Sequence, residues 1–377
     1  MSHPIFSEDH DLIRAQLRRF VDERVRPHGP KWEEAGFVPR ETLREMGELG
    51  FFSLRVPEAL GGAGLDARAS VVLAEEVGRS THGGFAITVL VHTDMASPHL
   101  VRFGTKRQLE KYLPGIMAGK LITAVGVTEP GAGSDVAGIR TRAVRDGDDW
   151  VITGRKMWIT NGTQADWLCL LARTDPDSQP GDYHGMSLII VPTSTPGFSV
   201  GRKIDKMGNR SSDTAEIVLD QVRVPVSNTI GEPDRGFQQQ MAQFQDERLV
   251  GAYIAVAGAR RALDRTKEYL QQRVAFGKPV SAQSVWHERI AESRCMIEQA
   301  RLLTLKAAYM MDTVGNKVAK AEIAMIKVVA PNMACDIIDM AIQAHGGGGV
   351  SDDFPLAYSY ANQRTLRLAD GPDEVHR

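Results

Sequence analysis

The sequence predicts an α+β protein in which an N-terminal helical domain, a middle antiparallel β-domain and a C-terminal four-helix bundle follow one another. Three observations predict this order: helical spacing of apolar residues up to about residue 120, strand-like spacing from there to about 232, and helical spacing again afterwards. The chain has 377 residues, 42% of them hydrophobic, which is enough to bury a large core. We therefore expect domains at residues 1–120, 121–232 and 233–377.

The first domain is predicted to be helical because its apolar residues recur at intervals of three and four. Leu17, Phe20, Val21 and Val25 follow this spacing, which places them on one face of a helix. The segment PEALGGAGLD, residues 57–66, contains too much glycine for a helix and is predicted to form a turn.

The middle domain is predicted to be a sheet because its apolar runs are short and closely spaced. The runs WVITG, MSLIIVP and AEIVLDQVRVP are separated by segments containing Gly, Pro, Asn and Asp. Such runs are typical of strands joined by turns, so we expect an antiparallel sheet.

The last domain returns to long stretches with helical spacing, for example Ile290, Ile297, Leu303 and Ala307. Helices of this length predict an antiparallel bundle. Pro331 lies inside one of them, and because proline removes a backbone hydrogen bond we expect a kink or a break there.

The composition argues against several classes of partner. The chain carries 45 Lys and Arg against 47 Asp and Glu, so no strongly basic surface is expected to bind nucleic acid. No run of 18 apolar residues occurs, and membrane insertion is not expected. The first twenty residues resemble neither a secretory signal nor a transit peptide. We therefore expect a cytoplasmic protein, or a mitochondrial matrix protein if a presequence has been removed.

The cysteines and histidines do not suggest a metal site or a disulfide framework. The three cysteines are far apart in the sequence. His82, His92 and His99 lie in one predicted helical region but lack a ligand spacing such as HExxH. We expect these histidines to have core or surface roles, and no metal.

Two segments of the middle region could contact a cofactor. In VTEPGAGSD, residues 127–135, the glycines either form an ordinary turn or leave backbone N–H groups free to meet a polar ring edge or a phosphate. In GRKMWITNG, residues 154–162, Trp158 and Thr160 share one side of a predicted strand. They form either part of the core or an aromatic wall with a hydroxyl donor for a flavin.

Five segments in order resemble the acyl-CoA dehydrogenase family along essentially the whole chain. They are VTEPGAGSD, KMWITNG, MGNRSSDT, RVAFGKPV and QAHGGGGV, which begin at residues 127, 156, 207, 273 and 343. The stretch 291–376 is most similar to the human acyl-CoA dehydrogenases numbered ten and eleven. By contrast, FQDERL, residues 244–249, is similar to long-chain, isovaleryl and citronellyl types.

The resemblance implies an FAD site built from more than one chain. Val127, Thr128 and Ser134 would contact the flavin ring, with Ser134 also facing the thioester arm of the substrate. Trp158 and Thr160 would line the other face of the flavin and its N5 side. The remaining implied FAD contacts are Arg273, Phe276, Gln283, Gln343, Gly346, Gly347, Pro372 and Glu374. Those from 273 to 347 would reach the FAD of a neighbouring subunit, which implies a homodimer or homotetramer. Pro372 stands where many relatives carry a Thr that binds the flavin.

The resemblance also implies a carboxylate base that removes the Cα proton of an acyl-CoA while the flavin accepts the Cβ hydride. Two positions of the family converge on this role, and here both carry an acid, Glu247 in the first long helix of the bundle and Asp370 in the loop before the last helix. Glu247 is our first choice and Asp370 the alternative. An acid near a helix end can also be only a cap or a dipole partner. Asp246 and Arg248 would contact the substrate.

The same resemblance implies an electron-transfer flavoprotein as the acceptor of the electrons. Two other functions stay open. Nitroalkane oxidases resemble this family and use an Asp at the loop position, which Asp370 also satisfies. A DNA-associated flavoprotein of the superfamily is the second alternative, against which the balanced charge argues.

Overall fold

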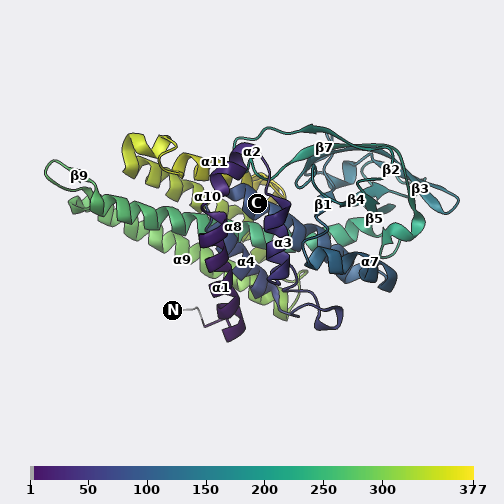
Figure 1. The fold of residues 1–377 in the computed structure, drawn as a ribbon, viewed down its shortest axis with the longest axis horizontal. Coiled ribbons are helices and arrows are strands. Elements are labelled where there is room, and N and C mark those ends of the chain that lie inside the picture. Colours follow the sequence, from purple (N-terminus) through teal and green to yellow (C-terminus); the bar gives the residue numbers. More distant parts are fainter. Residues whose placement is uncertain (1–3) are drawn as a thin grey trace.

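The computed structural model describes residues 4–377 and has the predicted succession of helices, sheet and helical bundle, which confirms the fold class (Figure 1). The N-terminal helices are α1 (Glu8–Phe20), α2 (Gly29–Ala35), α3 (Arg40–Glu48), α4 (Ala67–Gly78), α5 (Gly83–Leu90), α6 (Ser97–Phe103) and α7 (Lys106–Met117). α4 is buried along its whole length because it packs against α1, α5, α8 and α9. These helices therefore share one core with the C-terminal bundle.

The sheet lies at one end of the molecule (Figure 1). Its strands are β1 (Thr123–Gly126), β2 (Arg142–Asp146), β3 (Asp149–Ile159), β4 (Trp167–Arg173), β5 (Met186–Pro192), β6 (Phe198–Lys203), β7 (Ala215–Pro225) and β8 (Thr229–Ile230). The strand order is β6-β7-β3-β2-β4-β5-β8, with β1 also paired to β4. β4 is buried at every residue, as its unbroken apolar run WLCLL requires of a strand covered on both faces.

The sheet is mixed, whereas the sequence led us to expect an antiparallel one. β1 pairs with β4 in parallel, and β2 meets β4 in parallel at Arg142 and Arg173. The other pairs are antiparallel. The parallel pairing is possible because some forty residues separate β1 from β4, enough for a crossover connection. Short apolar runs predict strands but do not predict their direction.

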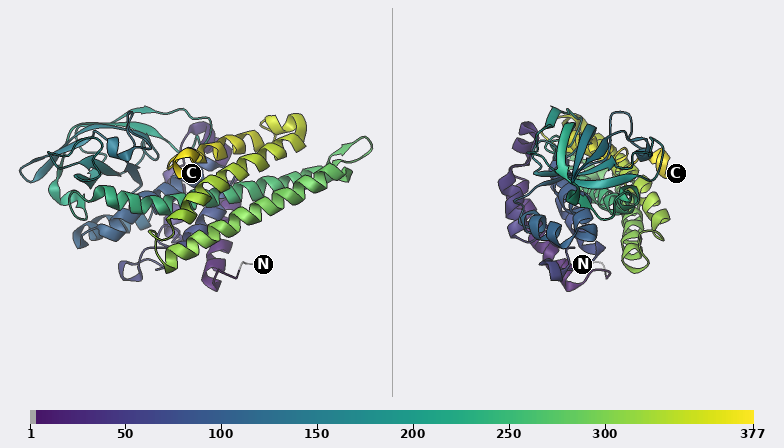
Figure 2. Two further views of the ribbon diagram at one scale, coloured as in Figure 1. Left: turned by 180° about the vertical axis from the view of Figure 1, so that it is seen from behind. Right: turned by 90° about the vertical axis from the view of Figure 1, so that its right-hand side faces the viewer.

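The bundle consists of α8 (Gly236–Gln272), α9 (Ser284–Thr313), α10 (Lys320–His345) and α11 (Leu356–Leu366), followed by the short α12 (Asp373–His376). α10 packs on α8, α9 and α11 and is not broken at Pro331. A small hairpin, β9 (Val274–Ala275) and β10 (Lys278–Pro279), joins α8 to α9 and projects from the end of the bundle opposite the sheet (Figures 1 and 2). In residues 4–377 no helix combines the length and the apolar character needed to span a membrane.

Candidate active site

The structure brings Glu247 and Asp370 together, although they lie on separate elements. Glu247 is on α8 and is only 2% exposed, while Asp370 is in the loop between α11 and α12. The two carboxyl groups lie close enough for each to change the proton affinity of the other. Burial raises the pKa of Glu247 well above its ordinary value, and the nearby charge of Asp370 raises it further. Two carboxyls this close cannot both be ionised cheaply, so we expect them to titrate as a unit.

Three cationic or polar side chains hold the loop that carries Asp370. Lys327 of α10 is buried and donates to the backbone oxygens of Leu366, at 2.7 Å, and Gly371, at 3.0 Å. The backbone oxygen of Asp370 is 3.4 Å from Nε of Arg248 and 3.0 Å from Nε2 of His376.

These neighbours affect the two carboxyl groups unequally. Burial raises the pKa of Asp370 as well, but the charges of Lys327 and Arg248 oppose that rise. Only Arg248 and a hydrogen bond from Gln240 oppose the rise at Glu247. Glu247 is therefore the member of the pair with the higher proton affinity, and Asp370 is the member that ionises first.

Gln240 is a site residue that the sequence argument did not identify. It lies two turns before Glu247 on α8 and is fully buried, and its Nε2 donates to Oε1 of Glu247 at 3.1 Å. The sequence did contain a signal for this contact: Gln240 and Glu247 are seven residues apart, which places both side chains on one face of a helix. His99 is also buried, and neither of its ring nitrogens has a hydrogen-bond partner within residues 4–377. Burial lowers the pKa of His99 to about 3, so this ring is neutral.

Replacing Gln240 by Leu is expected to move the acid limb of the pH–rate profile to higher pH by about one unit. The lost N–H stabilises the charged form of Glu247, and a hydrogen bond to a charged group contributes about 1.5–3 kcal/mol. The measurement is the pH dependence of kcat/KM with an acyl-CoA. Gln239→Leu is the matched control, since Gln239 is buried on the same helix, but its amide lies beside Gly231 and makes no hydrogen bond to Glu247 among the described residues. An unshifted profile in Gln240→Leu would show that the amide does not tune the pair.

Asp246 lies next to Glu247 in the sequence, but its side chain is part of a buried ionic network. Its Oδ1 accepts from Arg55 at 2.7 Å, and its Oδ2 accepts from Arg102 and Asn316, each at 3.1 Å. These contacts join α8 to the N-terminal helices. A substrate contact by Asp246 stays a prediction, and the observed partners favour a structural role.

The loop after β1 and the end of β3 form a surface that fits a flat ring. The backbone N–H of Met157 donates to the oxygen of Thr128 at 2.8 Å, which joins the two segments. Trp158 has a positive φ of 64° and is 54% exposed. In the loop, a Cβ added at Gly131 or Gly133 would meet no atom within 4 Å. An exposed indole beside open backbone is what a flavin site needs, because the ring can stack on one and hydrogen-bond to the other.

The remaining residues of this surface have the following environments. Val127 is buried and Thr128 is partly buried, while Ser134 is exposed. Thr160 Oγ1 lies 3.4 Å from Oγ1 of Thr214. Pro372 precedes α12, and Glu374 is exposed in its first turn.

The other predicted FAD residues lie away from this surface, near the far end of the bundle. Phe276, at the tip of the β9–β10 hairpin, is 98% exposed and has a positive φ of 53°. The others are also exposed: Arg273, Gln283, Gln343, Gly346 and Gly347. A large aromatic residue that is exposed and has a strained backbone is typical of a contact with another molecule. The separation agrees with two half-sites that a second chain would complete.

The histidines are dispersed in the structure. His92 approaches Thr123 Oγ1 and the backbone oxygen of Ile116, each at 3.1 Å, whereas His82 lies beside Arg26. Within residues 4–377 no group of three or more His, Cys, Asp or Glu could hold a metal ion. The cysteines form no disulfide.

Comparison with known proteins gives consistent matches along the chain. Family models described as acyl-CoA dehydrogenase N-terminal, middle and C-terminal domains match residues 7–120, 124–222 and 234–377. The mouse mitochondrial long-chain specific acyl-CoA dehydrogenase is 35% identical over 373 residues, which cover 98% of this chain and 85% of that protein.

Two solved structures are similar over nearly their whole length. An acyl-CoA dehydrogenase from Geobacillus kaustophilus has a TM-score of 0.94 and 36% identity, with coverage of 100% of this chain and 97% of that one. A glutaryl-CoA dehydrogenase from Mycobacterium smegmatis, solved in complex with FADH2, has a TM-score of 0.91 and 31% identity, with coverage of 99% and 93%.

Proposed function

We propose a function from the premise that this chain belongs to the acyl-CoA dehydrogenase family, as its three matching domains and its relatives show. It is therefore an FAD-dependent enzyme that dehydrogenates an acyl-CoA. The finer proposal is α,β-desaturation of the acyl group, in which a proton leaves Cα, a hydride leaves Cβ and a double bond forms between them. The observation that supports it most is the pair formed by buried Glu247 and partly buried Asp370, whose charges act on each other.

In this mechanism Glu247 acts in the state in which both carboxyl groups of the pair are ionised, and its carboxylate then takes the Cα proton. Its raised proton affinity suits this step, because a base works best when its pKa lies near the working pH. Asp370 raises that affinity through its charge, while Arg248 and Lys327 limit the net charge of the pocket. FAD, when bound, supplies the hydride acceptor. The residues that would hold it are Val127, Thr128, Ser134, Trp158 and Thr160.

The test is anaerobic bleaching of the flavin absorbance by a panel of acyl-CoA thioesters that differ in chain length and branching. At least one thioester is expected to reduce the flavin within the time of a turnover. If no thioester does so while a nitroalkane does, the oxidase alternative suggested by Asp370 replaces this proposal.

The proposed electron acceptor is an electron-transfer flavoprotein and not oxygen. We expect rapid reduction of a purified electron-transfer flavoprotein during acyl-CoA turnover, with only slow formation of hydrogen peroxide. The two rates are measured on the same preparation, by the absorbance of the acceptor and with an oxygen electrode. Oxygen consumption as fast as acyl-CoA turnover would contradict this assignment.

A further inference from the structure

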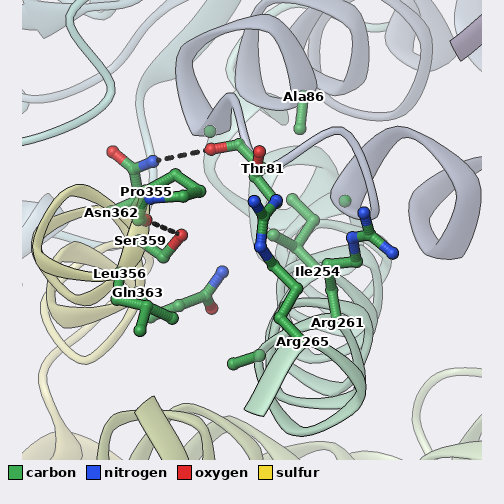
Figure 3. Close-up of a pocket in the computed structure, with 14 residues that line it drawn as sticks. Thr81, Ala86, Ile254, Arg261, Arg265, Pro355, Leu356, Ser359, Asn362 and Gln363 are labelled. Atoms are coloured by element: carbon green, nitrogen blue, oxygen red, sulfur yellow. Dashed lines mark hydrogen bonds between the residues drawn. The ribbon is translucent and has the colours of Figure 1, made fainter. Parts of the chain in front are cut away.

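A second cleft, outside the candidate active site, lies where α8, α11 and the turn between α4 and α5 meet (Figure 3). Its enclosed part has a volume of only about 20 Å³, enough for about one water molecule, and the rest of the cleft is open to solvent. The side chain of Arg265 extends from α8 toward Thr81, that of Arg261 extends from the same helix one turn away, and Gln363 extends from α11 toward α8 (Figure 3). We call this feature the arginine cleft.

The two arginines of the cleft are close to each other, and neither forms an ion pair within the described residues. They are one helical turn apart on α8, so their guanidinium groups share one face. Neither has an ion-pair or hydrogen-bond partner within residues 4–377, and Nε of Arg261 is buried without one. Burial lowers the pKa of Arg261, and the charges of Arg26 and Arg265 lower it further. The charge of Glu268 opposes this effect at both arginines without forming an ion pair with either, so the positive charge here is only partly balanced.

The nearby arginines differ from this pair because each has an acid of its own. Arg26 pairs with Asp22 at 2.9 Å, and Arg79 pairs with Glu76 at 2.8 Å. The fourteen residues that line the cleft include no Asp and no Glu. Any anion in direct contact with Arg261 and Arg265 must therefore come from outside the lining.

Gln363 also has hydrogen-bonding capacity that no described residue uses: its buried Oε1 requires a donor such as water, and its Nε2 can donate to an anion. Gln363 is 5% exposed, its Oε1 is buried without a partner, and its amide makes no hydrogen bond within the described residues. The amide lies against α8, since a Cβ added at Gly258 would come within 2.5 Å of its Nε2. Leaving such a buried group unsatisfied costs about 1–3 kcal/mol, and folded proteins rarely do so.

By contrast, the neighbouring amide of Asn362 has a hydrogen-bond partner for its oxygen and one for its nitrogen. Its Oδ1 accepts from the backbone N–H of Asn209 at 2.7 Å, and its Nδ2 donates to the oxygen of Thr81 at 3.5 Å. The unused hydrogen-bonding capacity therefore belongs to Arg261, Arg265 and Gln363, which come from two helices and face one cleft.

We propose that the arginine cleft binds a phosphate group. Guanidinium groups present planar sets of N–H donors that match the oxygens of a phosphate, and two of them with an amide N–H can satisfy several oxygens at once. The phosphate can be inorganic or can belong to a nucleotide, and both sources share this chemistry. The inference does not depend on the proposed function, because no lining residue of the cleft belongs to the candidate active site.

The experiment is isothermal titration calorimetry of the FAD-loaded protein with inorganic phosphate and, in a second arm, with adenosine 3′,5′-bisphosphate. Saturable binding is expected, weakened at least tenfold in Arg261→Gln/Arg265→Gln. Arg260→Gln is the matched control, because Arg260 is exposed on the same helix and does not line the cleft. The flavin spectrum of each variant shows whether it has folded and kept its cofactor.

The two arms distinguish the sources, since a nucleotide site binds the bisphosphate more tightly than the free ion. Absence of saturable binding in both arms, or equal binding by the double variant, overturns the proposal. Loss of binding when acyl-CoA saturates the protein places the phosphate in the substrate site and also overturns it. If the double variant no longer forms the wild-type oligomer and the wild-type protein binds neither phosphate nor the bisphosphate, the proposal is wrong. In that case the two arginines contact a carboxylate of a partner subunit.

Discussion

Replacing Glu247 by Gln is expected to lower acyl-CoA turnover by about a hundredfold or more, while FAD and acyl-CoA still bind. General bases contribute about 100- to 10,000-fold to a rate, and Gln keeps the shape of Glu but cannot accept the Cα proton. The measurement is the rate of flavin reduction under anaerobic conditions, with binding followed by the spectral change of the flavin.

Asp370→Asn is the companion variant and is expected to have a smaller effect, below about tenfold at the optimum pH. The charge of Asp370 raises the pKa of Glu247, so its removal lowers that pKa. Glu247 then ionises at lower pH, and the acid limb of the pH–rate profile moves to lower pH. This is the direction opposite to that expected for Gln240→Leu.

The reverse pattern would identify the loop acid as the base. In that case Asp370→Asn abolishes flavin reduction and Glu247→Gln leaves it nearly normal. A double variant that reduces its flavin at the wild-type rate would exclude both residues from the proton transfer.

Replacing Arg273 by Ala is expected to weaken FAD binding at least about thirtyfold and to loosen the oligomer at the same time. Loss of one partner of a buried, charge-assisted contact costs about 2–5 kcal/mol, and Arg273 is proposed to reach the FAD pyrophosphate of a neighbouring subunit. Arg273 is exposed and lies close in sequence to the strained Phe276 of the hairpin. This exposure leaves its side chain accessible to a neighbouring subunit. FAD content and molar mass in solution are measured together.

Arg223→Ala is the control for this experiment, because Arg223 is an exposed arginine of the sheet that pairs with Asp146 and Asp149. It is expected to keep both its FAD and its oligomeric state. A monomeric Arg273→Ala protein that still holds one FAD per chain would separate cofactor binding from assembly and contradict the shared site.

The sequence alone determined the fold class and the family. Helix and strand periods are local properties, so the change of spacing near residues 121 and 233 predicted the helices, the sheet and the bundle directly. The five ordered segments carried the resemblance because each is contiguous in the chain. They also placed Trp158 and Phe276 at positions that the structure shows to be exposed and strained.

Only the tertiary structure decided which distant residues meet. The approach of Glu247 to Asp370, the support of the loop by Lys327 and the partners of Asp246 all depend on how α8, α10 and the N-terminal helices pack. Strand direction and the arginine cleft depend on packing in the same way. The physical reason is that spacing along the chain fixes which face a side chain occupies. What that face contacts, and therefore its charge and hydration, is fixed by segments far away in sequence.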